Sequence, residues 1–231
     1  MKSRDVGLVC GLCVIGSSCF IARAGVIASD AFSYPDGALT GNNGGTGWTV
    51  IWVDSGLDVV SGAAVTNVFN NPPKYATRSF ANPAATGDLF FRVRIRTGSV
   101  TTADYFGCQM YTGVNNNVLL FGKGVGDTTF GVGNSGLVQS GVTVQPNTEY
   151  VLIGAHHIVP GPDPDQLMLW IDPDGSDYLD PATGANSADA MTLESVFFVA
   201  NSLIIFAGYP GCAFDDIVIS DDPAGVGLLA A

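Results

Sequence analysis

Residues 213–220 read Ala-Phe-Asp-Asp-Ile-Val-Ile-Ser, and residues 30–37 read Asp-Ala-Phe-Ser-Tyr-Pro-Asp-Gly. The later stretch combines β-branched and aromatic residues, and the earlier one contains the aromatic residues Phe32 and Tyr34, as is typical of strands on a half-buried pleated surface. One lies near each end of a chain of 231 residues. We expect each to be a strand of a single β-sandwich.

Between these stretches, short apolar runs alternate with turn sequences rich in Gly, Asn and Pro, such as residues 42–45 and 70–73. No helical periodicity persists for three turns after residue 25. In residues 89–96, apolar side chains alternate with arginines, as in a strand with one buried face, whereas residues 166–171 are apolar on both faces and predict a strand covered on each side. This rhythm of short runs and turns predicts an all-β fold, an antiparallel sandwich or barrel, over residues 25–220, followed by a flexible tail at residues 221–231.

The first 24 residues have the features of a cleaved signal peptide. A basic start precedes an apolar run from Val6 to Ile21, and Ala22-Arg23-Ala24 supplies the small-x-small pattern before Gly25. The run is shorter than the roughly 20 residues that span a bilayer. A lipoprotein attached at Cys19 is a weaker alternative, because Leu is missing three residues earlier. We therefore expect a protein that is secreted or held at the cell surface.

The predicted mature chain is strongly acidic and has only two cysteines. Removing residues 1–24 removes three basic residues and one acidic residue, which takes the net charge from −12 to −14. That charge disfavours nucleic acid and anionic membranes as partners and suits cations or neutral polysaccharides, although solubility alone explains it too. Cys108 and Cys212 can form a disulfide in an oxidising compartment or remain buried free thiols; both alternatives stay open.

The chain resembles bacterial exported proteins with a laminin G-like or concanavalin A-like lectin/glucanase domain, often followed by a PEP-CTERM sorting tail. The resemblance rests on four groups of residues along the chain. These are 32–39 with 44–48, 104–107 with 120–123, 169–173, and 214–219. Of the two all-β architectures, it implies the sandwich: a two-sheet antiparallel β-sandwich of jelly-roll type, with adjacent first and last strands. It departs from the family after Ser220, where no Pro-Glu-Pro motif follows, so surface anchoring through such a tail is not expected.

Catalytic groups of the glucanase type are not found in the sequence. Glycoside hydrolysis normally needs two carboxylates that flank the bond, and the family's glucanases place Glu-x-Asp-x-x-Glu on one strand. The chain has two glutamates, Glu149 and Glu194, and no such strand. His156 and His157 are adjacent on a predicted strand, so they point to opposite faces and do not form a metal clamp together. No catalytic residue is therefore assigned.

Three groups of residues are candidates for binding. Trp48 and Trp52 flank a loop in which Asn42 and Asn43 offer amides, and such aromatics can stack on sugar rings, although they can also fill the end of the sandwich. A stripe of arginines can bind carboxylates or sulfates of an acidic polysaccharide, or it can pair with neighbouring acidic residues. Clustered aspartates can hold a structural calcium or close turns. The arginines are Arg92, Arg94 and Arg96, and the aspartates are Asp172, Asp174 and Asp177 in one loop and Asp30 with Asp215 or Asp216 between the terminal strands.

These observations predict a secreted, non-catalytic β-sandwich module that binds carbohydrate or extracellular matrix, with structural calcium as its one possible cofactor. Two alternatives from other classes stay open. One is a structural exported or surface protein without a small ligand, and the other is a glycan-active enzyme of glucanase-like fold.

Overall fold

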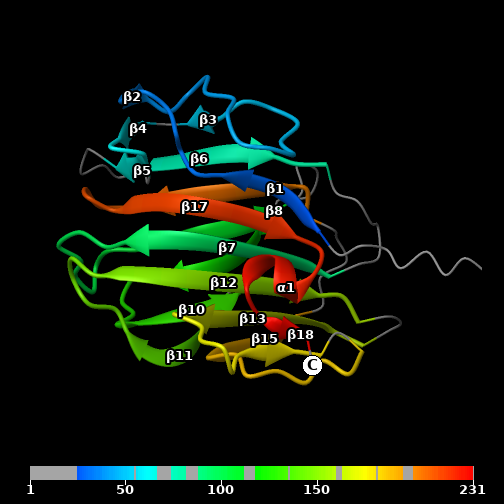
Figure 1. Ribbon diagram of the computed structural model, residues 1–231. Coiled ribbons are helices and arrows are strands. Elements are labelled where there is room, and N and C mark those ends of the chain that lie inside the picture. The colour runs from blue at the N-terminus through cyan, green and yellow to red at the C-terminus, as the bar shows by residue number, and fades with distance from the viewer. Residues whose placement is uncertain are drawn as a thin grey trace, which may run out of the picture.

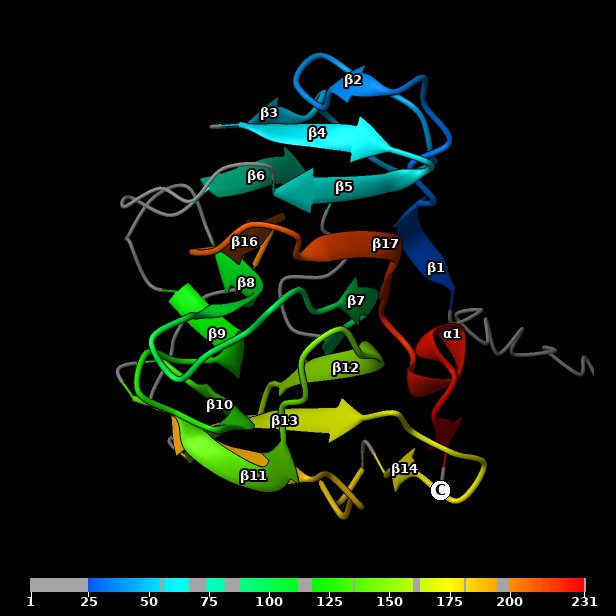
Figure 2. The ribbon, with the colours of Figure 1, turned by 90° about the vertical axis from the view of Figure 1, so that its left-hand side faces the viewer.

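A computed structural model describes residues 25–54, 56–66, 74–81, 88–111, 118–134, 136–159, 163–180, 182–194 and 200–230. The predicted signal peptide lies outside these residues. Two antiparallel β-sheets are stacked face to face, and Figure 2 shows them as two layers. The predicted two-sheet antiparallel β-sandwich is confirmed.

One sheet has nine strands within the described residues, and it faces the viewer in Figure 1. Its order is β15-β13-β12-β7-β17-β5-β4-β2, and β1 also pairs with β17. The strands are β1 (Val26–Asp30), β2 (Gly37–Ala38), β4 (Leu57–Val60), β5 (Ala63–Thr66), β7 (Leu89–Arg96), β12 (Glu149–His157), β13 (Asp165–Ile171), β15 (Ala190–Glu194) and β17 (Ala213–Ser220).

The other sheet has seven strands within the same part of the chain, in the order β11-β10-β9-β8-β16-β6-β3. These are β3 (Val53–Asp54), β6 (Lys74–Ser79), β8 (Phe106–Tyr111), β9 (Val118–Lys123), β10 (Thr129–Gly133), β11 (Val138–Thr143) and β16 (Ser202–Ala207). A short parallel pair, β14 (Tyr178–Leu179) and β18 (Leu229–Ala230), lies outside both sheets.

The first and last long strands lie side by side, as predicted, but the first strand is β1 (Val26–Asp30) and the predicted stretch of residues 30–37 overlaps it only at Asp30. β1 pairs antiparallel with β17, with Asp30 opposite Ile217 and Val26 opposite Ser220. The two strands are about 190 residues apart in sequence, so this pairing joins the two ends of the described chain in one sheet.

The main core fills the space between the sheets. On β7, the side chains of Phe91, Val93 and Ile95 are fully buried in this core, while the arginines between them face outward. The period of two predicted for this strand is therefore the observed one.

A second apolar cluster lies on the outer face of the nine-stranded sheet. Met168 and Trp170 of β13 belong to it, whereas Leu167 and Leu169 of the same strand belong to the core between the sheets. Strand β13 is thus covered on both faces, as its sequence predicts. The remaining members are Phe90, Ile153, Ala155, Leu179, Val218, Val226 and Leu228.

The C-terminal residues cover this second cluster, so the prediction of a flexible tail is wrong for residues 221–230. Helix α1 (Pro223–Val226) lies over the outer face of the nine-stranded sheet (Figure 1), and β18 pairs with β14. Asp222 caps the helix by accepting from the amide of Ala224, and Gly227 ends it in the left-handed conformation. Val226 and Leu228 are buried here, and this burial orders the segment. Among the described residues, no helix is long and apolar enough to cross a membrane.

Candidate functional site

The predicted tryptophan platform is a buried ion-pair cluster, not a free surface. Trp52 is fully buried and its indole N–H donates to Oδ2 of Asp30 at 2.9 Å. Arg78, also buried, lies 2.5 Å from the same carboxylate oxygen. The guanidinium carbon of Arg78 lies 5.0 Å and 5.5 Å from the ring centroids of Trp48 and Trp52, a cation–π arrangement. The two indoles therefore close the end of the sandwich.

The two asparagines of this loop also have structural partners. Nδ2 of Asn42 donates to the carbonyls of Ala38 and Leu39 at 3.0 and 3.1 Å, and Oδ1 of Asn43 accepts from Arg78 at 2.9 Å. The four predicted sugar-contacting residues are brought together, as the sequence suggests, but both indole N–H groups, Nδ2 of Asn42 and Oδ1 of Asn43 form hydrogen bonds within the protein. Stacking on Trp52 is excluded by its burial.

Asp30 is not a calcium ligand in this arrangement, which corrects the prediction. Besides Arg78 and Trp52, its carboxylate accepts from the amide of Phe32 at 2.8 Å and from the hydroxyl of Tyr34 at 2.5 Å. Burial and the hydrogen bond to Asp30 raise the pKa of Tyr34, so this phenol remains a donor at neutral pH. Both oxygens accept hydrogen bonds within the protein and Asp30 is 2% exposed, so the carboxylate belongs to the ion-pair cluster.

Arg92 and Arg94 of the stripe are paired with the acids at the centre of β17, whereas Arg96 makes no ion pair with a described residue. Arg92 lies 2.8 Å from Asp216, while Arg94 lies 3.6 Å from Asp216 and 3.9 Å from Asp215. Strict alternation predicts opposite faces for these two aspartates, and this prediction is wrong. Asp216 has a φ of 50° at a bulge in the register between β17 and β7, and the extra residue turns both carboxylates toward the arginines.

The aspartates of residues 172–177 act as turn acceptors. Asp172 accepts from the amide of Val151 at 2.7 Å, and Asp174 accepts from the amide and hydroxyl of Ser176 at 2.7 and 2.6 Å. Asp177 accepts from the amide of Asp174 at 2.8 Å. No group of three or more His, Cys, Asp or Glu side chains within the described residues is arranged to hold a metal.

Both histidines are buried in separate histidine–aspartate pairs. Nε2 of His156 lies 2.8 Å from Asp165, and Nδ1 of His157 lies 2.8 Å from Asp88. They are adjacent on β12 and so point to opposite faces as predicted, and both are buried, with His156 0% and His157 7% exposed. Burial lowers the pKa of His156, whereas the hydrogen bond to Asp88 raises the pKa of His157.

Cys108 and Cys212 are buried free thiols. Of the two alternatives, a disulfide or free thiols, the structure has the free thiols. Both side chains belong to the core between the sheets. Burial raises the pKa of Cys212 to about 12 and that of Cys108 well above its ordinary value, which makes both thiols weak nucleophiles.

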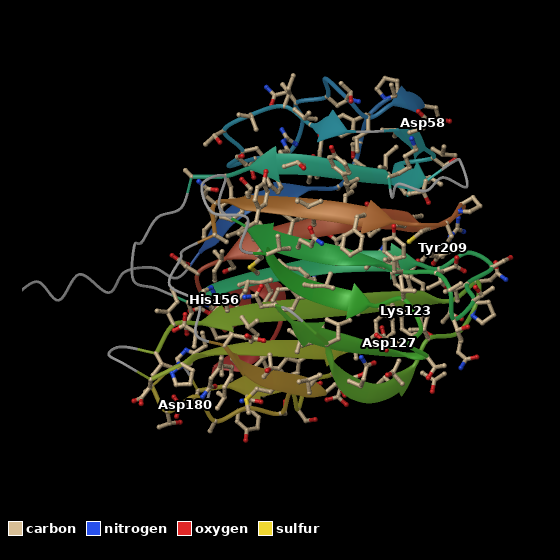
Figure 3. All side chains as sticks on the ribbon, turned by 180° about the vertical axis from the view of Figure 1, so that it is seen from behind. Asp58, Lys123, Asp127, His156, Asp180 and Tyr209 are labelled. Carbon is tan, nitrogen blue, oxygen red and sulfur yellow. The ribbon has the colours of Figure 1, made fainter. Side chains whose placement is uncertain are left out.

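An open groove on the outer face of the seven-stranded sheet has the chemistry of a ligand site, and the sequence reasoning did not find it. Its volume is about 480 Å³. The register places Tyr75 of β6 beside Phe206 of β16, and Phe206 beside Gly107 of β8. The remaining lining residues are Tyr105, Gln109, Leu120, Lys123, Gly124, Val125 and Ile204. Figure 3 views this sheet from outside, with Lys123 labelled at one end of its strands.

The groove combines aromatic rings with few polar groups. Tyr75 is 46% exposed, and the rings of Tyr105 and Phe206 lie 6.2 Å apart at 36°. Gln109 is half-buried, and its side-chain amide makes no hydrogen bond to any other described residue. Burial raises the pKa of Tyr105, so its hydroxyl is a donor at neutral pH. Such a site offers apolar faces and a few neutral hydrogen-bonding groups.

Lys123 lies at the end of the groove, but its charge is used by the backbone. Its ammonium donates to the carbonyls of Thr102 and Gly124 at 3.3 and 3.2 Å and to that of Asp104. Burial lowers the pKa of Lys123, opposed by the carboxylates of Asp104 and Asp127. The side chain therefore anchors the loops beside the groove and leaves little positive charge for a ligand.

The sequence does not predict the groove because its strands, β6, β8, β9 and β16, come from distant parts of the chain, apart from the consecutive pair β8 and β9. One signal was present: Tyr105, Gly107 and Gln109 alternate with buried residues, so they share one outward face. Nothing local predicts that this face meets Tyr75 and Phe206.

No protein-family model and no curated protein sequence matches the chain. Among solved structures, a carbohydrate esterase from the Shiga toxin-encoding bacteriophage phi24B is 15% identical, with a TM-score of 0.50 over 86% of this chain and 99% of that one. A glycosyl hydrolase family protein from Mycobacterium fortuitum is 10% identical, with a TM-score of 0.52 over 84% and 99%. A structure described with endo-acting O-glycanases of human gut microbiota is 9% identical, with a TM-score of 0.55 over 85% and 99%.

At such identities, these matches establish a shared fold. The structures that this β-sandwich resembles are carbohydrate-active proteins. The laminin G-like and PEP-CTERM features of the predicted resemblance remain predictions.

Proposed function

We propose that this protein is an exported, non-catalytic module that binds a neutral glycan in the groove of the seven-stranded sheet. The observation that supports it best is the juxtaposition of Tyr75, Tyr105 and Phe206 around the half-buried amide of Gln109. Exposed aromatic rings hold the apolar faces of sugars, and a few neutral hydrogen-bonding groups fix their orientation.

Charge supports a neutral ligand over an acidic one. The residues that line the groove include no Asp or Glu and one cation, Lys123, whose ammonium is engaged by carbonyls. The whole chain has a net charge of −12, which repels acidic polysaccharides. The carbohydrate-active neighbours make a glycan a more specific proposal than an extracellular-matrix protein.

Paired variants test this function. Tyr75→Ala and Tyr105→Ala each remove an aromatic face, and we expect each to weaken retention of the protein in neutral-polysaccharide affinity gels at least about tenfold. Tyr178→Ala makes the same change on β14, outside both sheets, and is expected to leave retention unchanged. If neither groove variant alters retention of a polysaccharide that binds the wild type, the groove is not the site.

The alternative of a glycan-active enzyme is tested with the same polysaccharides. The proposal predicts that the bound glycans keep their length and substituents, as measured by reducing-end assay and mass spectrometry. Shortened or deacylated products formed by the purified protein would show catalysis. Complete absence of binding to a broad glycan array would instead favour a structural exported protein.

Export is a separate part of the proposal. Cleavage between Ala24 and Gly25 gives a chain that begins where β1 begins, and the amide nitrogen of Gly25 lies 2.9 Å from Oδ1 of Asp221. Mass spectrometry of the exported protein is expected to find Gly25 at the N-terminus. An intact N-terminal segment, or a lipid attached at Cys19, would contradict this prediction.

A further inference from the structure

A second pocket lies where β7 ends and β17 begins, and it shares no lining residue with the groove. Its volume is about 600 Å³, and residues 96–99, Asn147 and residues 209–211 line it. Its position is marked in Figure 3 by Tyr209, at the same end of the sandwich as Lys123. The volume lies within the range of small-molecule sites.

Arg96 gives the pocket a positive charge that no ion pair within the described part of the chain neutralises. Arg92 and Arg94 on the same stripe contact acids, whereas no hydrogen bond or ion pair joins the guanidinium of Arg96 to any other described residue. Glu149 is opposite Arg96 in the register, yet its carboxylate lies 3.6 Å from Nε of Arg94. No acidic residue lines the pocket.

Tyr209 adds a buried hydroxyl whose hydrogen has no strong acceptor. The residue is 2% exposed. The neighbours of its hydroxyl are the backbone amide of Gly98, which is a donor, and the thiol of Cys212, which is a weak acceptor. A buried donor left unsatisfied costs stability, so it favours a ligand that brings an acceptor.

Hydrogen bonds hold the rim of the pocket in place. The amide of Asn147 donates to the carbonyl of Gly98 at 2.9 Å, although Asn147 has a φ of 52°. The hydroxyl of Thr97 donates to the carbonyl of Gln145 at 2.7 Å and accepts from the amide of Thr148 at 2.9 Å. A rim fixed in this way lowers the entropic cost of binding.

We propose that this pocket binds the carboxylate of a small organic acid of monosaccharide size, such as a hexuronic acid. Arg96, the hydroxyl of Tyr209 and the side-chain amide of Asn147 supply donors without a competing carboxylate in the lining. The planar guanidinium matches a carboxylate in a paired, charge-assisted geometry. The site goes beyond the proposed function, because it takes an anion on residues that the neutral groove does not use.

Calorimetric titration of the mature protein with matched sugars tests this site. D-glucuronate and D-galacturonate are expected to bind saturably, while D-glucose and D-galactose, which lack the charge, do not displace them. Arg96→Gln is expected to weaken binding at least about tenfold. Arg92→Gln changes an arginine of the same strand that already pairs with Asp216, and binding is expected to stay within about twofold. Tyr75→Ala, in the groove, is expected to have no effect.

Several results would overturn the proposal. These are no saturable binding of either uronate, equal binding of the neutral sugars, an unchanged affinity in Arg96→Gln, or equal losses in the Arg92 and Arg96 variants. Sulfate that binds as tightly as the uronates would show a general anion site and overturn the carboxylate assignment. Tyr209→Phe, checked for folding by thermal melting, is expected to weaken binding as well.

Discussion

At the scale of single residues, the buried pair of Asp30 and Arg78 explains the role of the aromatic loop. Tryptophans beside asparagines in a Gly-rich loop predict a surface platform. In the structure, however, the guanidinium of Arg78, from β6, lies over both indole rings. The sequence cannot show this, because nothing near residues 42–52 specifies where that guanidinium lies. The loop is therefore structural.

Arg78→Met tests this role. Removing one partner of a buried pair leaves the other charge in a poorly solvated site, and we expect a loss of about 3–5 kcal/mol in the free energy of unfolding. Urea denaturation measures it. The control is Arg92→Met, whose pair with Asp216 is about one-third exposed, and we expect that change to cost about 0–1 kcal/mol. Equal, small losses in both variants would contradict the structural role.

The two histidines predict opposite pH dependences of stability. The pKa of His157 is raised by Asp88, so its contribution is fully present below about pH 6.5 and disappears as the pH rises through the folded-state value. The pKa of His156 is lowered by burial, so stability falls as the pH drops below about 6.5 toward its folded-state value.

Urea unfolding of two variants at two pH values measures these contributions. His157→Gln is expected to destabilise the protein more at pH 5.5 than at pH 8.5, whereas His156→Gln is expected to destabilise it less at pH 5.5 than at pH 8.5. The same pH dependence in both variants would contradict the assignment of the two pairs.

At the scale of elements, the bulge in β17 shows where sequence patterns fail. Simple alternation places Asp215 and Asp216 on opposite faces, but one added residue at φ 50° puts both beside Arg94. Bulges depend on how neighbouring strands pair, which the sequence of one strand does not determine. The alternation in β7 holds because the extra residue lies in β17, while β12 keeps a continuous register with β7.

The C-terminal segment is a second element that sequence patterns missed, and it gives a direct test. Leu228 is 2% exposed and Leu229 is 52% exposed. Leu228→Ala removes buried apolar atoms over Trp170, and we expect a loss of about 2 kcal/mol or more. Leu229→Ala is expected to change stability by less than about 0.5 kcal/mol. Thermal melting with tryptophan fluorescence compares them; equal effects would mean that the tail does not pack on the sheet.

At the scale of the whole molecule, the fold could be predicted and the candidate site could not. Strand lengths, turns and the period of two predict an antiparallel sandwich or barrel, and the family resemblance implies two sheets with adjacent first and last strands. The groove depends instead on the order β9-β8-β16-β6, which brings Tyr75 and Phe206 together across 131 residues of sequence. Neighbouring strands lie about 4.8 Å apart, so these four strands span about 14 Å, enough for a short run of sugar rings.

The most direct test of the groove is a chemical-shift map of the isotope-labelled protein as it binds a neutral oligosaccharide that the wild type retains. We expect the largest shifts at the amides of Tyr75, Gln109 and Phe206, and we expect them to vanish in Tyr75→Ala. Shifts centred instead on Trp48 and Asn43, or on the outer face of the nine-stranded sheet, would contradict the assignment of the groove as the glycan site.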